Sequence, residues 1–212
     1  MKNKNKISGL YVISDTTRSN GRTHEEVVAA AVAGGAKLIQ LREKALPARE
    51  LYPVALRLRE LTRKAGALFI INDSVELALV SDADGVHLGQ DDMPVEAARK
   101  LLGPDRVIGV STHSLEQALS AEREGADYIG FGPVFPTSTK DAGEAKGLDA
   151  LREIRSRTKI PIVAIGGIDK GNAGGVIAAG ADAVAVISAV TMAEDIREAV
   201  EKLAGALSGR SR

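Results

Sequence analysis

Two aspartates follow neighbouring apolar runs of the chain and could together bind a divalent cation. Asp73 comes directly after LFIIN, and Asp92 ends the segment GVHLGQDD. Two carboxylates at one site repel each other unless a cation lies between them. Mg²⁺ commonly takes one or two carboxylates and completes its shell with water and phosphate oxygens. Either aspartate alone could simply cap the following helix, so the prediction of a Mg²⁺ site depends on the pair.

A basic segment follows another apolar run. In QLREK, Gln40, Arg42 and Lys44 occupy alternate positions, so along an extended segment their side chains point the same way. Arginine offers phosphate a two-pronged donor, and lysine offers a point charge. Charged residues at a strand end are usually only solvated, but beside a Mg²⁺ site this triplet is typical of a clamp for a diphosphate.

A second anion site is indicated further along the chain. Gly166 and Gly167 close the run IPIVAIGG, and Ser188 follows AVAVI. A glycine or serine that follows a buried strand and opens a helix often binds phosphate through main-chain N–H groups. A glycine pair also suits a tight turn with positive φ, and that interpretation is compatible with phosphate binding.

The chain offers few groups for acid–base or nucleophilic catalysis. Cysteine is absent, and the histidines are His24, His87 and His113. We interpret His87 as a structural residue inside a strand and His113 as a helix-start residue, because no histidine and carboxylate pair is evident. The sequence therefore favours a reaction whose main requirement is stabilisation of a leaving group.

Composition argues against macromolecular partners. Lys plus Arg and Asp plus Glu are 28 each, so no overall field would attract nucleic acid or an anionic membrane. Aromatic residues make up 3% and Trp is absent, which disfavours stacking platforms for bases. The start, MKNKNKISG, has no apolar segment for export or anchoring. We therefore expect a cytoplasmic protein with small-molecule substrates; the composition does not indicate an oligomeric state.

Eight short apolar runs must position these residues. They are continuous in character, as expected of strands buried on both faces of a parallel sheet, and they are LYVIS, KLIQL, LFIIN, GVHLG, RVIGV, YIGFG, IPIVAIGG and AVAVI. Helix-like segments lie between them. The pattern predicts an α/β fold consisting of a single (β/α)8 TIM barrel, with catalytic residues at the carboxyl ends of the strands. The alternative, a doubly wound sheet, lacks its GxGxxG turn. We assign residues 9–207 to the barrel, and 1–8 and 208–212 to flexible tails.

Seven segments, in order along almost the whole chain, resemble the thiamine phosphate synthase family. They are QLREK, IND, DGVHLGQDD, GVSTHS, GADYIGFGPVFPTSTK, PIVAIGGI and GADAVAVISAV. The resemblance implies a transferase that joins 4-amino-2-methyl-5-pyrimidinylmethyl diphosphate to a thiazole phosphate, with Mg²⁺, giving thiamine phosphate and diphosphate. It also implies that diphosphate leaves first and that the thiazole nitrogen captures the resulting pyrimidine cation.

The resemblance also implies roles for individual residues. Those that would bind the pyrimidine diphosphate are Gln40, Leu41, Arg42, Glu43, Lys44, Asn72, Ser111 and Lys140. Those that would bind the thiazole phosphate are Thr137, Ser138, Thr139, Gly167, Ile187 and Ser188. Asp73 and Asp92 would bind Mg²⁺, and the cationic groups expected to act in catalysis are Arg42, Lys44 and Lys140.

Three other functions compete with this prediction. A thiazole tautomerase of the same fold would use a histidine near the sixth strand's loop, which reads GPVFPT here. A non-catalytic barrel that binds thiazole phosphate or thiamine phosphate would not need paired aspartates. A phosphosugar isomerase or lyase would need an acid–base pair. The transferase is favoured, and Lys140 is expected to bridge the two anion sites.

Overall fold

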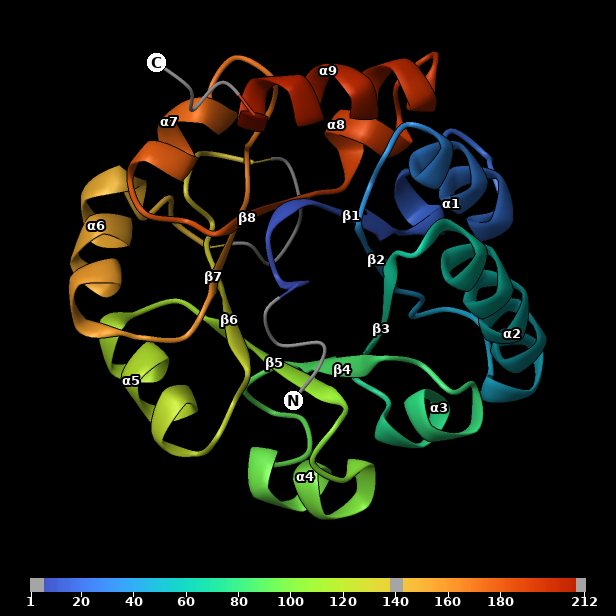
Figure 1. The fold of residues 1–212 in the computed structure, drawn as a ribbon, viewed down its shortest axis with the longest axis horizontal. Helices are drawn as coiled ribbons and strands as arrows, with labels where there is room; N and C mark the ends of the chain where they lie inside the picture. The colour runs from blue at the N-terminus through green and yellow to red at the C-terminus, as the bar shows by residue number, and fades with distance from the viewer. Residues whose placement is uncertain (1–5, 138–142, 209–212) are drawn as a thin grey trace.

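The computed structural model describes residues 6–137 and 143–208. Eight parallel strands close into a barrel in sequence order, with β1 pairing to both β2 and β8 (Figure 1). The strands are β1 (Gly9–Ser14), β2 (Leu38–Leu41), β3 (Leu68–Asn72), β4 (Gly85–Leu88), β5 (Val107–Thr112), β6 (Tyr128–Phe131), β7 (Ile162–Ile165) and β8 (Ala183–Val186). The predicted (β/α)8 barrel is confirmed, and the doubly wound alternative is excluded.

Helices surround the barrel (Figure 1). They are α1 (His24–Ala33), α2 (Ala48–Ala65), α3 (Val75–Val80), α4 (Val95–Leu102), α5 (Leu115–Arg123), α6 (Gly147–Arg157), α7 (Ala173–Ala178), α8 (Ser188–Thr191) and α9 (Ile196–Ser208), with a 3-10 turn η2 (Thr16–Arg18) after β1. Several begin where the sequence supplies a cap. Thr23 and Glu26 form a capping box on α1, and Ser74 and Ser114 accept N–H groups at the starts of α3 and α5.

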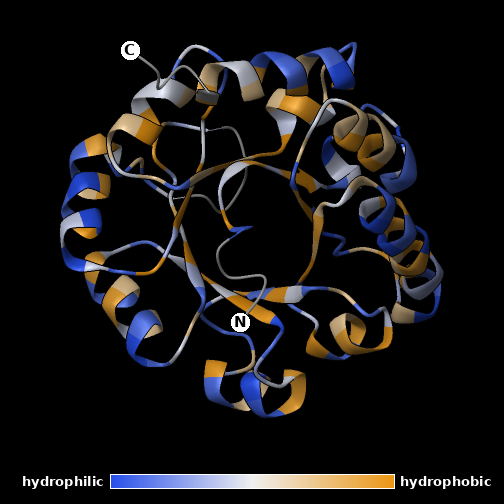
Figure 2. Ribbon diagram, in the orientation of Figure 1, coloured by the Kyte–Doolittle hydropathy of each residue, from blue (hydrophilic) through white to orange (hydrophobic). Residues whose placement is uncertain are grey.

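Alternation along the strands separates two buried clusters. Tyr11 and Leu38 belong to a cluster inside the barrel, whereas Val12 and Ile39 belong to the larger cluster between the sheet and the helices. In Figure 2, the orange of hydrophobic residues accordingly appears on the strands and on the inward sides of many helices. Continuing the alternation past Leu38 predicts that Gln40 faces the barrel interior and that Leu41 faces the helices.

Aspartates lie at three of the junctions where a helix ends and the next strand begins. The carboxylates of Asp84, Asp127 and Asp182 each accept the N–H of a residue in the preceding strand, at 2.8 Å. Each also forms an ion pair with an arginine, from α2, α4 and α6 respectively. Each junction therefore ties two strands and a helix together at the end of the barrel opposite the expected site.

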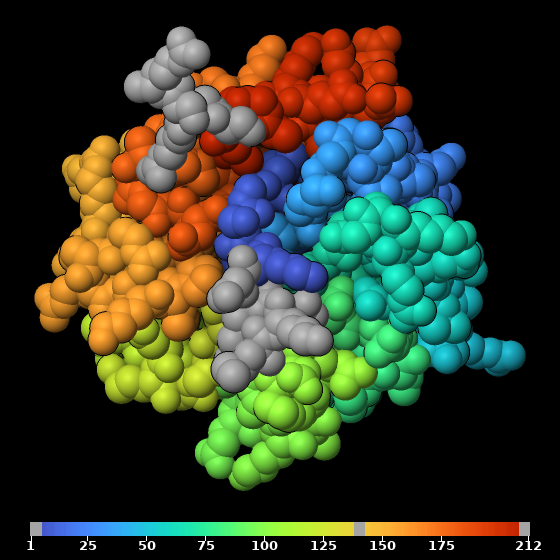
Figure 3. Space-filling model, viewed as in Figure 1, coloured from blue at the N-terminus to red at the C-terminus, as the bar shows by residue number. Residues whose placement is uncertain are grey.

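The first described residues lie across one end of the barrel. Ile7 is buried in the interior cluster, and the blue N-terminal segment lies near the centre of the face seen in Figures 1 and 3. Ile7 therefore packs on apolar side chains at the base of the barrel although it falls within residues 1–8, and the assignment of residues 1–8 and 208–212 to flexible tails stays a prediction.

No helix within residues 6–137 and 143–208 is both long and apolar enough to cross a membrane. The cytoplasmic location stays a prediction.

Candidate active site

A cavity of about 340 Å³ opens among the carboxyl ends of the strands. Many of the residues predicted from the sequence line it: Gln40, Arg42, Lys44, Asn72, Ser111, Thr137, Gly167, Ile187 and Ser188. The structure therefore gathers side chains from both predicted anion sites around one space. Ser138, Thr139 and Lys140 lie outside the described residues.

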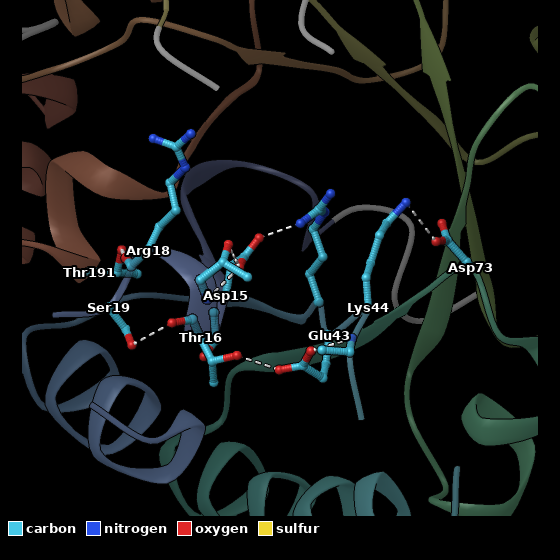
Figure 4. A network of polar contacts seen from close by, with 12 residues as sticks. Asp15, Thr16, Arg18, Ser19, Glu43, Lys44, Asp73 and Thr191 are labelled. Atoms are coloured by element: carbon cyan, nitrogen blue, oxygen red, sulfur yellow. Dashed lines mark hydrogen bonds and ion pairs between the residues drawn. The ribbon is translucent and has the colours of Figure 1, made fainter. Parts of the chain in front are cut away.

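Arg42 and Lys44 line the cavity from the segment after β2, and Figure 4 shows Lys44 pointing towards Asp73. The guanidinium of Arg42 forms an ion pair with Asp15, a buried carboxylate in the loop after β1. Asp15 also accepts the N–H of Thr17 at 3.0 Å, so its own position is fixed. Lys44 Nζ lies 3.6 Å from Asp73 Oδ2 and its side chain is largely exposed. The two cations are thus held by carboxylates on opposite sides.

Glu43 points away from the cavity between these two cations. Its side chain is 1% exposed and contacts His24, whose Nε2 lies 3.3 Å from Glu43 Oε2. Thr16 donates its hydroxyl to the same oxygen, and the N–H of Ala45 donates to Oε1 at 2.7 Å. On the other side of the ring, His24 Nδ1 lies 2.7 Å from Ser14 Oγ. These contacts hold the QLREK segment in one register.

The pKa of Glu43 reflects this environment. Burial alone would raise it, but hydrogen bonds from Thr16, the Ala45 N–H and His24 outweigh burial, and the pKa is lowered below the ordinary 4.5. Leu41 is also buried away from the cavity, against the helices. The substrate contacts predicted for Leu41 and Glu43 stay predictions, and their side chains are placed to support the segment.

Replacing Glu43 with glutamine should lower the free energy of unfolding by about 1–3 kcal/mol near neutral pH, because an amide cannot accept all the hydrogen bonds the carboxylate accepts. Since the folded-state pKa of Glu43 is lowered, the difference between wild type and variant should be present above the unfolded pKa and vanish as the pH falls through the folded pKa. Urea unfolding across this range measures it. Glu60→Gln removes an exposed carboxylate paired with Lys64 and should change little; equal effects of the two changes would contradict the role of Glu43.

The two predicted metal ligands lie together. Asp73 follows β3 in a left-handed conformation with φ 63°, and its N–H donates to His87 O at 2.8 Å. The pKa of Asp73 is raised, first by burial and then by the hydrogen bond and negative charge of Asp92. The positive charge of Lys44 lowers this pKa, but only in part. Asp92 Oδ2 accepts the N–H of Gly89 at 2.6 Å. A pair of carboxylates in mutual repulsion fits a divalent cation.

The donor set also suits Mg²⁺ rather than a metal with an all-protein shell. Within the described ranges, no group of three or more His, Cys, Asp or Glu side chains could hold a metal ion. Mg²⁺ needs only one or two carboxylates when water and phosphate oxygens complete its octahedron. The residues present therefore fit this ion in the company of a diphosphate.

The loop after β6 packs on the glycine pair after β7. Val134 and Phe135 donate their N–H groups to Ile165 O and Gly166 O, at 2.9 and 3.0 Å. Gly166 and Gly167 have φ values of 98° and 63°, and a Cβ on either would lie 2.5 Å from a proline of that loop. Glycine is therefore required there by both conformation and space, and the turn brings Thr137 to the same cavity as Gly167.

The histidines at the cavity are held by neutral partners. His87 contacts Tyr128 and Ser111 through its two nitrogens, each at 2.9 Å. Burial lowers the pKa of His87 to about 4, so the ring is neutral near pH 7. His113 Nδ1 donates to Gly132 O at 2.7 Å. Both residues line the cavity, although the sequence suggested only structural roles for them.

Comparison with known proteins decides what kind of barrel this is. A family model described as thiamine monophosphate synthase matches residues 10–190. The chain belongs to this family. Among relatives, the thiamine-phosphate synthase of Moorella thermoacetica is 55% identical over 92% of this chain and 93% of its own, and that of Chloroflexus aurantiacus is 53% identical over 94% and 92%.

Solved structures agree with the family. The thiamine phosphate pyrophosphorylase of Pyrococcus furiosus has a TM-score of 0.89 and 49% identity, covering 97% of both chains. The (S)-3-O-geranylgeranylglyceryl phosphate synthase of Thermoplasma acidophilum has 14% identity and a TM-score of 0.70, and this likeness shows the fold alone. The resemblance seen in the sequence is confirmed: the thiamine monophosphate synthase family is one of enzymes, and this member is a thiamine-biosynthetic transferase.

Proposed function

We propose that the protein condenses 4-amino-2-methyl-5-pyrimidinylmethyl diphosphate with a thiazole phosphate, giving thiamine phosphate and diphosphate. The observation that carries this proposal is the convergence of a basic clamp and a glycine turn on one cavity of about 340 Å³. The paired carboxylates lie beside it, where Lys44 of the clamp is 3.6 Å from Asp73. Relatives about half identical over nearly the whole chain carry the name thiamine-phosphate synthase.

Arg42 and Lys44 would hold the diphosphate of the pyrimidine substrate. Both line the cavity, and their carboxylate partners keep them there before substrate arrives. The pyrimidine would lie deeper, against Gln40, Asn72 and Ser111, which share the cavity wall. A preformed site of this kind needs little reorganisation when charge develops.

Asp73 and Asp92 would hold Mg²⁺ at the diphosphate. When bound, the ion supplies charge stabilisation to the leaving oxygens without any proton transfer. Lys44 lies 3.6 Å from Asp73, so it can exchange that carboxylate for a phosphate oxygen as the site fills. Asp73 keeps its orientation through its left-handed backbone and its N–H bond to β4.

The thiazole phosphate would lie on the opposite side of the cavity. Gly167, Ile187 and Ser188 line that side, where α8 begins. The first main-chain N–H groups of a helix are a common binding site for phosphate. Thr137 is placed beside them, and Ser138 and Thr139 follow it in the chain. The assignment of Ser138, Thr139 and Lys140 rests on the family motif, because these residues lie outside the described ranges.

The reaction needs charge stabilisation more than proton transfer. The C–O bond to the diphosphate breaks, the aminopyrimidine stabilises the resulting cation, and the lone pair of the thiazole nitrogen forms the new C–N bond. Arg42, Lys44 and Lys140 would meet the growing charge on the diphosphate. No base is required, which agrees with histidines that contact hydroxyl and carbonyl oxygens at the cavity.

The proposed function is tested by following thiamine phosphate in the presence of both substrates and Mg²⁺, and then with one substrate withheld. We expect product only when all three are present. Binding of thiazole phosphate without any product would indicate a non-catalytic barrel. Isomerisation of a thiazole carboxylate phosphate without the pyrimidine substrate would indicate a tautomerase, and either result would overturn the proposal.

A further inference from the structure

A hydrogen-bonded chain of five side chains crosses the barrel at the floor of the cavity. Gln40 Nε2 donates to Tyr11 OH at 3.0 Å, and Tyr11 OH lies 3.1 Å from Tyr128 OH. Tyr128 OH lies 2.9 Å from His87 Nδ1, and His87 Nε2 lies 2.9 Å from Ser111 Oγ. These residues connect β2, β1, β6, β4 and β5 in turn, and Gln40, Tyr11, His87 and Ser111 line the cavity.

Gln40 sets the first step of a possible direction for these hydrogen bonds. An amide nitrogen only donates, so Tyr11 accepts from Gln40, while either hydroxyl can be the donor between Tyr11 and Tyr128. In the direction that starts from Gln40, Tyr11 donates to Tyr128 and Tyr128 donates to His87 Nδ1. A neutral imidazole that accepts at Nδ1 carries its proton on Nε2, so in this direction His87 donates to Ser111 Oγ. The hydroxyl proton of Ser111 is then left to point elsewhere.

We propose that Tyr11, Tyr128 and His87 are positioning residues that present Gln40 as an acceptor and Ser111 as a donor to the pyrimidine. The inference rests on the proposed function and deepens it. A 4-aminopyrimidine offers an N–H donor beside a ring-nitrogen acceptor, which is the complement of these two groups. A 4-oxopyrimidine has an acceptor in place of the amino donor and leaves Gln40 facing another acceptor, so the chain would select for the amino form.

Two glycines keep the rings of this chain in place. A Cβ on Gly109 would lie 2.1 Å from Tyr128 Cζ, and one on Gly130 would lie 3.0 Å from His87 Cε1. The Tyr128 ring lies edge-on to Tyr11, with centroids 6.3 Å apart, and 5.4 Å from the His87 ring. The backbone is therefore shaped around the aromatic residues, which keeps the hydrogen-bonding atoms of Tyr128 and His87 in fixed positions.

The tautomer of His87 can be read directly by ¹⁵N NMR of protein labelled at histidine. The protein contains only three histidines, so the signal lost in His87→Gln identifies the signal of His87. Near pH 7 we expect a neutral ring with its proton on Nε2. A proton on Nδ1 would mean that the hydrogen bonds from Gln40 to Ser111 run in the opposite direction, and it would overturn the inference. This measurement does not use turnover, so it is independent of the proposed function.

A double-mutant cycle tests the consequence for substrate. Tyr128→Phe keeps the ring but removes the hydroxyl that donates to His87, so His87 is no longer held with its proton on Nε2. The variant should therefore raise KM for the pyrimidine diphosphate about 5–30-fold, the range for one lost hydrogen bond. Ser111→Ala should do the same, and the double variant should lose no more than Ser111→Ala alone. Losses that multiply would show that Tyr128 acts independently of Ser111 and would overturn the inference.

Selectivity and a matched control complete the test. Tyr128→Phe should narrow the preference for the 4-amino over the 4-oxo pyrimidine diphosphate, which a purely structural defect would not do. Tyr52→Phe removes the hydroxyl of an exposed tyrosine on α2 and should leave both KM and selectivity unchanged. An unaltered preference in Tyr128→Phe, with its KM raised, would assign Tyr128 to packing alone and overturn the role proposed for it.

Discussion

Replacing Asp73 with asparagine should lower thiamine phosphate formation by about 10²–10³-fold, the loss expected when one group that stabilises transition-state charge is removed. Asparagine is the informative substitution because Asp73 has φ 63°, a conformation that Asn tolerates better than Ala. The fold should therefore survive. Initial rates at saturating substrates, with Mg²⁺ varied, provide the measurement.

The same substitution should raise the thermal stability of the metal-free protein. Burial and Asp92 raise the pKa of Asp73, so the folded protein binds this proton more tightly than the unfolded chain does. Stability of the wild type then falls as the pH rises from the ordinary value of 3.8 through the raised pKa. The asparagine side chain has no charge to repel Asp92, and the Asp73→Asn variant should lack this decline in a pH series of melting curves.

Mg²⁺ should reverse the order of stability. A ligand that binds only the folded state stabilises it by mass action, so Mg²⁺ with diphosphate should raise the melting temperature of the wild type more than that of Asp73→Asn. An equal rise in both proteins would contradict the assignment of Asp73 as a ligand.

Replacing Arg42 with alanine should lower kcat by about 10²–10³-fold, because the guanidinium would stabilise the diphosphate more as it leaves than while it is bound. Arg42→Lys should restore only part of the rate, since lysine lacks the two-pronged geometry. Steady-state kinetics separate kcat from KM. A variant with raised KM and unchanged kcat would show that Arg42 contributes only uniform binding and would contradict its role in the chemical step.

A matched control for Arg42 lies on the outside of the barrel. Arg57 on α2 forms an ion pair with Glu25 on α1, and its side chain is 55% exposed. Arg57→Ala removes the same type of side chain from an ion pair and should leave kcat unchanged. A comparable loss in both variants would point to a general effect of net charge or stability.

Much of the site could be predicted because a parallel barrel gathers the residues that follow its strands. Gln40, Asn72 and Ser111 lie at the ends of β2, β3 and β5, and the rule that such ends meet is enough to place them together. Alternation within QLREK correctly separated Arg42 and Lys44 from the residue between them. The same reasoning left Glu43 without a partner, since its partners come from the β1–α1 region.

Other parts of the site depend on contacts that no local pattern reveals. Asp15 directly follows the run LYVIS, at the same end of the barrel, and could have been found by extending the strand-end rule to the first strand. The contacts of His87 with Tyr128 and Ser111 span 41 and 24 residues of sequence. A histidine inside a strand gives no sign of such partners until the barrel closes.

Measuring diphosphate and thiamine phosphate together in one reaction tests whether Asp73 and its neighbours act at the step that forms the C–N bond. With both substrates and Mg²⁺, we predict that the two products appear in equal amounts, and that Asp73→Asn slows both by the same factor. Two results would contradict a site where these residues bind and release the diphosphate as the C–N bond forms. One is thiamine phosphate formed at the wild-type rate in Asp73→Asn or without divalent metal. The other is diphosphate released with no thiamine phosphate while both substrates are present.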